Sequence, residues 1–187
     1  MRIAISGSHG VGKTTLSIAL ANATGIPRIS EIARNVAQKQ EYKTTEEIKN
    51  ASLEDRIVFQ KAILLEQATQ ESLHRAGFIS DRSIFDTIAY SKYYDLPKGM
   101  VAVAESTAIT NSTKYDLIIY CPIPGNTSPV DDGFRLTDLK SQLIIDKYIR
   151  KLLNKALCPV LWLPLDRSLW GDIAMKEMKI LTRRISS

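Results

Sequence analysis

The residues at positions 7–14 place the strongest constraint on how this chain can fold. They read Gly-Ser-His-Gly-Val-Gly-Lys-Thr and fit the pattern G-x-x-x-x-G-K-[ST] without a mismatch. An apolar run at residues 2–6 precedes them, and a helical pattern at residues 13–23 follows. A strand, glycine-rich loop and helix in this order direct backbone N–H groups and the positive end of a helix dipole toward one point. The chain is therefore expected to hold phosphate at the end of its first strand.

Strand-like and helix-like segments alternate along the rest of the chain. Further short apolar runs occupy residues 27–30, 78–80, 117–121 and 160–163. Helical patterns cover residues 53–76, 83–94, 139–153 and the segment from about 168 onward. This alternation indicates parallel strands with right-handed crossovers, and unbroken apolar strands indicate a sheet covered on both faces. We predict one α/β domain over residues 1–187 with the three-layer P-loop NTPase fold, about five parallel strands flanked by helices, as in nucleotide kinases.

Local patterns add detail to this prediction. Residues 44–47 have the form of a capping box, which predicts the start of a helix. Trp162 lies in an apolar run and is expected in the core, whereas Trp170 fits either the core or an interface. The apolar face of the long helix after residue 52 is expected to include Leu53, Ile57, Leu64 and Ala68.

Each residue type in the glycine-rich loop has a chemical use. Lys13 places a point charge on the β- and γ-phosphates, and Thr14 offers a hydroxyl to Mg²⁺. Thr15 is expected at the α-phosphate, and His9 is expected near the phosphates as a loop residue. The pattern thus predicts ATP and Mg²⁺ as the bound cofactors, held by Gly7, Ser8, His9, Gly10, Val11, Gly12, Lys13, Thr14 and Thr15.

The composition excludes several other classes of protein. No apolar run approaches the roughly 20 residues that a membrane span needs, and the first residues do not have the form of a signal peptide. Cys121 and Cys158 are too few and too far apart for a disulfide framework or a zinc site. We expect a cytoplasmic protein with reduced thiols and no membrane contact. The net charge of +5 leaves nucleic acid open as a partner, and a homodimer is open as well.

The positions of two motifs exclude two classes of nucleotide-binding protein. A GTPase needs a base-reading [NT]-K-x-D tetrad after a strand, whereas residues 113–116 precede their strand, and no D-x-x-G switch is present. A motor ATPase needs an acidic pair at the end of a strand, whereas Asp81 is followed by Arg82. The remaining interpretation is a kinase that acts on a small molecule or a nucleotide.

Three further segments resemble parts of known kinases. Residues 78–83, Phe-Ile-Ser-Asp-Arg-Ser, with Asp86 and Tyr90 after them, resemble the D-R-[ST/Y] segment of thymidylate and deoxynucleoside kinases. Residues 31–34, Glu-Ile-Ala-Arg, look like the E-x-x-R element of the ribosylnicotinamide kinase domain of NadR-type proteins, and residues 131–135 are similar to its D-G-x-R lid segment. Along the chain the order is the glycine-rich loop, the E-x-x-R element, the acidic strand end, the strand at residues 115–120 and the D-G-x-R segment, which together cover nearly the whole chain. The resemblance implies a nucleoside or nucleotide as the phosphate acceptor.

Phosphoryl transfer mainly requires positioning and charge neutralisation, which suggests roles for the charged residues of these segments. Asp81 would hold Mg²⁺ together with the loop threonine, and Glu31 would accept the proton of the acceptor hydroxyl or orient that hydroxyl. Arg135 would reach the transition state from a lid over residues 122–136. The expected catalytic residues are Lys13, Glu31, Asp81, Arg82 and Arg135. The expected acceptor-binding residues are Glu31, Arg34, Arg82, Asp86 and Tyr90.

Several alternatives stay open at this point. Glu31 could be a first-turn helix glutamate, Asp81 could cap the following helix, and the tyrosines at positions 90, 93 and 94 could be core residues. Thymidylate kinases carry an acidic residue where this chain has residues 8–10, so the acceptor is not fixed. One alternative function is a kinase acting on a hydroxymethylated base or an end in DNA or RNA. Another is a regulatory ATPase that switches with its nucleotide.

Overall fold

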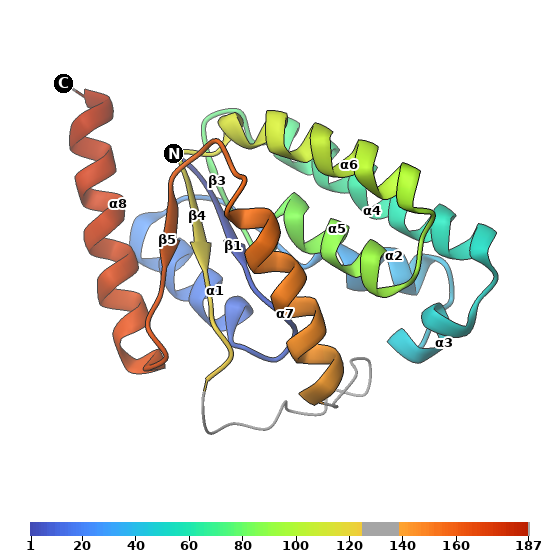
Figure 1. Cartoon of the computed structure of the whole chain (residues 1–187). Helices are drawn as coiled ribbons and strands as arrows, with labels where there is room; N and C mark the ends of the chain where they lie inside the picture. Colours follow the sequence, from blue (N-terminus) through green and yellow to red (C-terminus); the bar gives the residue numbers. More distant parts are fainter. Residues whose placement is uncertain (125–138, 187) are drawn as a thin grey trace.

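The computed structural model describes residues 1–124 and 139–186, and it contains a five-stranded parallel sheet between two layers of helices (Figure 1). Across the sheet the strand order is β2-β3-β1-β4-β5, and every neighbouring pair is parallel. The strands are β1 (Arg2–Ser6), β2 (Arg28–Ile29), β3 (Phe78–Ser80), β4 (Leu117–Tyr120) and β5 (Val160–Trp162). The predicted α/β class with parallel strands is confirmed.

Helices cover both faces of the sheet. One face packs against α1 (Lys13–Thr24) and α8 (Trp170–Ser186). The opposite face packs against α2 (Ile32–Lys39), α4 (Leu53–Leu73), α5 (Ile84–Tyr93), α6 (Lys98–Asn111) and α7 (Leu139–Leu153). The short helix α3 (Thr45–Asn50) begins with the predicted capping box, in which Thr44 and Glu47 bond each other's backbone. No helix in the described part of the chain is long and apolar enough to span a bilayer.

The side chains of β1 show why the strands read as unbroken apolar runs. Successive strand residues point to opposite faces. Ile3 and Ile5 pack into the core beneath α1 and α8, whereas Ala4 packs into the core on the other side. Both faces are buried, so every strand position favours an apolar residue. Since β1 lies between β3 and β4, the loop that follows it opens at the centre of the sheet edge where strands end, the usual place for ligands in such folds.

Two expectations for the core are wrong. Trp162 is 42% exposed, because β5 is an edge strand with a neighbour on one side, and its ring leans on Tyr120 at 4.7 Å between centroids. Leu53 is 45% exposed, and the buried face of α4 carries polar side chains instead. There Glu71 accepts hydrogen bonds from Gln67 at 2.6 Å and from Tyr115 at 2.7 Å. The hydrophobic pattern of the sequence did not predict that this polar face of α4 is buried, and it did not predict the helix α6.

Candidate functional site

The glycine-rich loop leaves β1 and enters α1 through backbone conformations that need glycine. Gly7 has a φ of 150°, and a Cβ at this position would lie 2.5 Å from the Cys121 carbonyl oxygen. Gly12, at a φ of 105°, would place a Cβ against the guanidinium of Arg167. The loop is therefore pressed between β4 and the turn after β5, and side chains at these two positions would push it out of place.

Inside the loop, Lys13 is buried although it carries a charge. It is 5% exposed, and its Nζ donates to the carbonyl of Ser8. The Ser8 hydroxyl is fully buried and has no hydrogen-bond partner among the described residues. Buried polar groups normally have partners. An ammonium and a hydroxyl held in this way fit a loop that binds the oxygens of a phosphate chain.

Asp81 follows β3, the neighbour of β1, so it lies beside the loop. It is 2% exposed and accepts an ion-paired hydrogen bond from Arg28 at 3.2 Å. Burial raises the pKa of the Asp81 carboxyl, whereas Lys13 and the Thr14 hydroxyl act in the opposite direction. No cluster of three or more metal-ligating side chains occurs in the described residues. One hydroxyl and one carboxylate fit Mg²⁺, which binds through few protein ligands together with phosphates.

Glu31 and Arg82 form an ion pair on the same side of the loop as Asp81, because they follow β2 and β3. Glu31 is the N-cap residue of α2, but its side chain makes no capping hydrogen bond. Its Oε1 accepts from Nη2 of Arg82 at 2.6 Å and from Nε at 3.0 Å, and both side chains are largely buried. Burial disfavours the charge of Arg82, yet the adjacent carboxylate raises the guanidinium pKa well above its ordinary value. Arg82 therefore keeps its charge inside a sheltered site.

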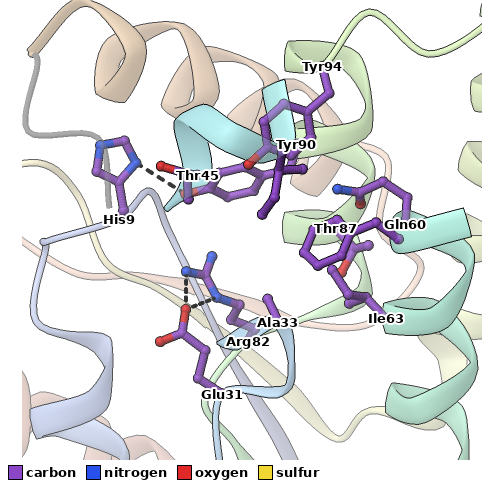
Figure 2. Close-up of a pocket in the computed structure, with 12 residues that line it drawn as sticks. His9, Glu31, Ala33, Thr45, Gln60, Ile63, Arg82, Thr87, Tyr90 and Tyr94 are labelled. Carbon is purple, nitrogen blue, oxygen red and sulfur yellow. Dashed lines mark hydrogen bonds and ion pairs between the residues drawn. The ribbon is translucent and has the colours of Figure 1, made fainter. Parts of the chain in front are cut away.

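This ion pair lies in the wall of a pocket that is partly open to solvent (Figure 2). The guanidinium of Arg82 lies over the ring of Tyr90, 5.3 Å from its centroid. The hydroxyl of Tyr90 meets Nδ1 of His9 at 3.1 Å, so a residue of the loop also belongs to the pocket. The lining residues are His9, Glu31, Ala33, Thr45, Ile48, Phe59, Gln60, Ile63, Arg82, Thr87, Tyr90 and Tyr94. A mostly apolar cavity with a few converging polar groups is typical of a small-molecule site.

Comparison with known proteins gives the family. A family model described as "AAA domain" matches residues 2–169. The chain belongs to this AAA domain family. No curated protein matches it by sequence. Since Asp81 is followed by Arg82 and not by a second acid, this AAA domain lacks the strand-end acidic pair that a motor ATPase needs.

Solved structures show which proteins share the fold of this AAA domain. A deoxyadenosine kinase from M. mycoides with bound dCTP has 15% identity and a TM-score of 0.64, over 96% of this chain and 99% of that one. The same kinase with dCMP and dCDP bound gives 17% identity, a TM-score of 0.65 and coverage of 97% and 100%. NadR protein in complex with NR gives 25% identity, a TM-score of 0.62 and 88% coverage of this chain, but only 45% of NadR. The predicted resemblance to P-loop nucleoside kinases is confirmed.

The structure separates the predicted acceptor residues into two groups. Glu31, Arg82 and Tyr90 line the pocket, whereas Arg34 lies on α2 outside its lining. The tyrosines divide too, because Tyr94 lines the pocket while the Tyr93 hydroxyl accepts from Lys49 at 3.2 Å. Arg135 and the predicted lid from residue 125 onward, including the D-G-x-R segment, lie outside the described residues.

Asp86 is fully buried, and its carboxylate oxygens accept hydrogen bonds from groups of the protein itself. It accepts from the Gly7 amide at 3.1 Å and from the Ser6 hydroxyl at 2.7 Å. It also accepts from the backbone and hydroxyl of Ser83, with which it forms the capping box of α5. We therefore replace the acceptor-binding role predicted for Asp86 with a structural one: it joins the start of the phosphate loop to the start of α5.

Replacing Asp86 with alanine is expected to lower the free energy of unfolding by about 3 kcal/mol, since buried donors lose their acceptor. For a domain of this size that corresponds to a fall in melting temperature of about 6–12 °C. Calorimetry would measure it, with the exposed Asp172 of α8 as the control; Asp172→Ala should cost less than about 1 kcal/mol. Equal melting temperatures of the two variants would contradict the structural role.

Two residues at the loop were missed in the sequence. Arg167, in the turn after β5, donates from Nε and Nη2 to the Val11 carbonyl at 3.0 and 2.5 Å. Gln142, on α7, donates from Nε2 to the His9 carbonyl at 2.7 Å. The rule that site residues follow strands could have found Arg167. No local pattern distinguishes Gln142, because its contact depends on how α7 packs.

Proposed function

We propose that the protein is an ATP- and Mg²⁺-dependent kinase that transfers the γ-phosphoryl group to a hydroxyl of a nucleoside. The observation that carries this proposal is the Glu31–Arg82 ion pair in a largely apolar pocket, with the loop residue His9 in the same wall. The pocket provides a carboxylate for the acceptor hydroxyl and a cation for the transferred group. The loop provides the phosphate site next to it.

The donor and the acceptor would approach the loop from opposite edges of the sheet. Glu31 and Arg82 follow β2 and β3, whereas Arg167 follows β5 at the other edge. The phosphate chain must point toward the acceptor, so the nucleoside part of ATP would extend toward Arg167. Arg167 donates twice to the Val11 carbonyl and packs over the ring of Trp170 at 5.7 Å, so its guanidinium would lie beside the donor site.

In the proposed reaction the acceptor oxygen attacks the γ-phosphorus and the bond to the β-phosphate oxygen breaks, which releases ADP. Glu31 takes the proton of the acceptor hydroxyl. Lys13 and Arg82 neutralise charge on the transferred group. Thr14 and Asp81 would hold Mg²⁺, which neutralises phosphate charge when bound. The predicted single-domain organisation, its lid and the role of Arg135 stay part of this proposal.

The charge of the pocket favours a nucleoside over a nucleoside monophosphate. Among its described lining residues, Glu31 and Arg82 are the only two that carry a full charge at pH 7 by their ordinary pKa values, and they neutralise each other. A phosphate monoester would bring a charge of about −1.5 to −2 into this sheltered space. A neutral nucleoside needs no further cation. Its base would lie among the apolar lining residues, with the Gln60 amide as a polar contact.

A labelling experiment tests this proposal. The protein is incubated with γ-labelled ATP and, separately, with nucleosides, nucleoside monophosphates, ribosylnicotinamide and DNA that contains a hydroxymethylated base. We expect the label in a nucleoside pool. Label in a monophosphate would contradict the charge argument, and label in DNA would favour the polymer kinase. Slow release of phosphate with no labelled acceptor would favour the regulatory ATPase.

A further inference from the structure

His9 connects the phosphate loop to two other parts of the protein at once. It is 2% exposed, its carbonyl accepts from Gln142 of α7, and its imidazole Nδ1 meets the hydroxyl of Tyr90 on α5. The first contact joins the backbone of the loop to α7. The second crosses from the loop into the pocket, where Figure 2 shows His9 and Tyr90 facing each other.

Tyr90 also contacts Arg82, a member of the Glu31–Arg82 ion pair. The Arg82 guanidinium lies over its ring at 5.3 Å, and Arg82 in turn donates twice to Glu31. Tyr94 packs on the Tyr90 ring, with centroids 6.0 Å apart, which limits how far that ring can move. The order of contacts is therefore His9, Tyr90, Arg82 and Glu31, and all four residues line the pocket. A shift of the loop at His9 would change the wall of the acceptor site.

We propose that the hydrogen bond between His9 and Tyr90 couples nucleotide binding at the loop to acceptor binding in the pocket. His9 is in this sense a positioning residue for the acceptor, and this role rests on the proposed function of the pocket. A triphosphate that settles on the loop fixes His9, and His9 fixes Tyr90 and the guanidinium stacked on it. The coupling is reciprocal, so a bound acceptor strengthens nucleotide binding by the same factor.

The strength of one hydrogen bond sets the expected size of the coupling. A neutral hydrogen bond inside a protein contributes a factor of about two to ten in an equilibrium constant. We therefore expect that a non-hydrolysable ATP analogue with Mg²⁺ raises acceptor affinity several-fold in the wild-type protein. Removing the hydrogen bond should reduce this factor by about two- to ten-fold.

Tyr90→Phe removes only the hydroxyl that meets His9 and keeps the ring beneath Arg82. Tyr93→Phe is a matched control on the same helix, because its hydroxyl contacts Lys49 and lies outside the pocket lining. His9→Ala removes the other partner, and His9→Asn keeps a short polar group in its place. We expect loss of coupling in Tyr90→Phe and His9→Ala, partial return in His9→Asn and no change in Tyr93→Phe. The double variant should lose no more than either single one.

The first measurement needs no acceptor, so it separates this inference from the proposed function. Fluorotyrosine is incorporated, the Tyr90 signal is assigned with Tyr90→Phe, and adenylyl imidodiphosphate with Mg²⁺ is added. The Tyr90 signal should shift in the wild-type protein and not in His9→Ala. The second measurement is the calorimetric affinity for deoxyadenosine, or for the nucleoside that the labelling experiment identifies, with and without the analogue. The inference would be overturned if the Tyr90 signal of the wild-type protein did not shift when the analogue is added, or if coupling were unchanged in Tyr90→Phe and His9→Ala. Failure to label any nucleoside would overturn the proposed function alone.

Discussion

Lys13→Ala is expected to lower the turnover of ATP by about 10³-fold, while the protein stays folded. The Lys13 ammonium is buried inside the loop and donates to the Ser8 carbonyl, so its charge is fixed where the β- and γ-phosphates would lie. A fixed charge in a sheltered site stabilises the transition state far more than a mobile one in water. The variant loses that charge and gains nothing to replace it.

Stability should respond much less than activity to this substitution. The Ser8 carbonyl loses one hydrogen bond, which corresponds to about 1 kcal/mol and a few degrees in melting temperature. Turnover of labelled ATP and the melting temperature would be measured on the same sample. Lys176→Ala, on the exposed side of α8, is the control and should leave both unchanged. Wild-type turnover in Lys13→Ala would show that the loop is not the site of phosphoryl transfer.

The loop itself was predictable because its chemistry is local in the sequence. A glycine-rich pattern between a strand and a helix needs no knowledge of the rest of the fold, and the same is true of Asp81 directly after β3. The parallel order of the strands then brings Asp81 beside Thr14, because the carboxyl ends of neighbouring strands meet. Periodicity and strand order were sufficient for this part of the site.

The supports of the loop were not predictable from local patterns. His9 contacts Gln142, and Val11 contacts Arg167, across more than a hundred residues of sequence. Such contacts depend on how α7 and the turn after β5 pack, and no spacing rule encodes them. Asp86 is a different case, because Ser83 and Asp86 have the spacing of a capping box. That local pattern indicated a structural role, whereas the family resemblance suggested acceptor binding.

The polar face of α4 shows the same limit from the side of the core. Gln60, Gln67 and Glu71 are buried, although hydrophobic periodicity assigns such residues to the surface. Glu71 is satisfied by Gln67, by Tyr115 and by an ion pair with Lys114 at 2.5 Å. These partners, one on α4 itself and two adjacent residues before β4, offset the free-energy cost of burying the carboxylate. Gln60, on the same face, lines the pocket, so one of these buried polar side chains belongs to the candidate site.

Glu31→Gln is expected to lower kcat by about 10²- to 10⁴-fold, the usual contribution of a general base. Glutamine keeps the shape of the side chain, and its amide oxygen can still accept from Arg82, which now donates to Oε1 of Glu31 at 2.6 Å. It cannot take a proton from the acceptor hydroxyl. The KM for ATP should change little, because the phosphate loop is untouched. Steady-state kinetics with the nucleoside that acquires label would measure both constants.

The split between kcat and KM decides what Glu31 does. Glu46→Gln, an exposed position in the first turn of α3, is the control and should match the wild-type protein. A variant with normal kcat and a raised acceptor KM would show that Glu31 only orients the hydroxyl, and proton transfer would then have to be assigned elsewhere. A fall in kcat with an unchanged KM for ATP places the carboxylate at the reacting oxygen. Glu31→Gln removes both the proton acceptor and the charged partner of Arg82. Arg82→Lys separates these two effects, because it keeps the Glu31 carboxylate and a cation beside it. We expect a smaller fall in kcat in Arg82→Lys than in Glu31→Gln.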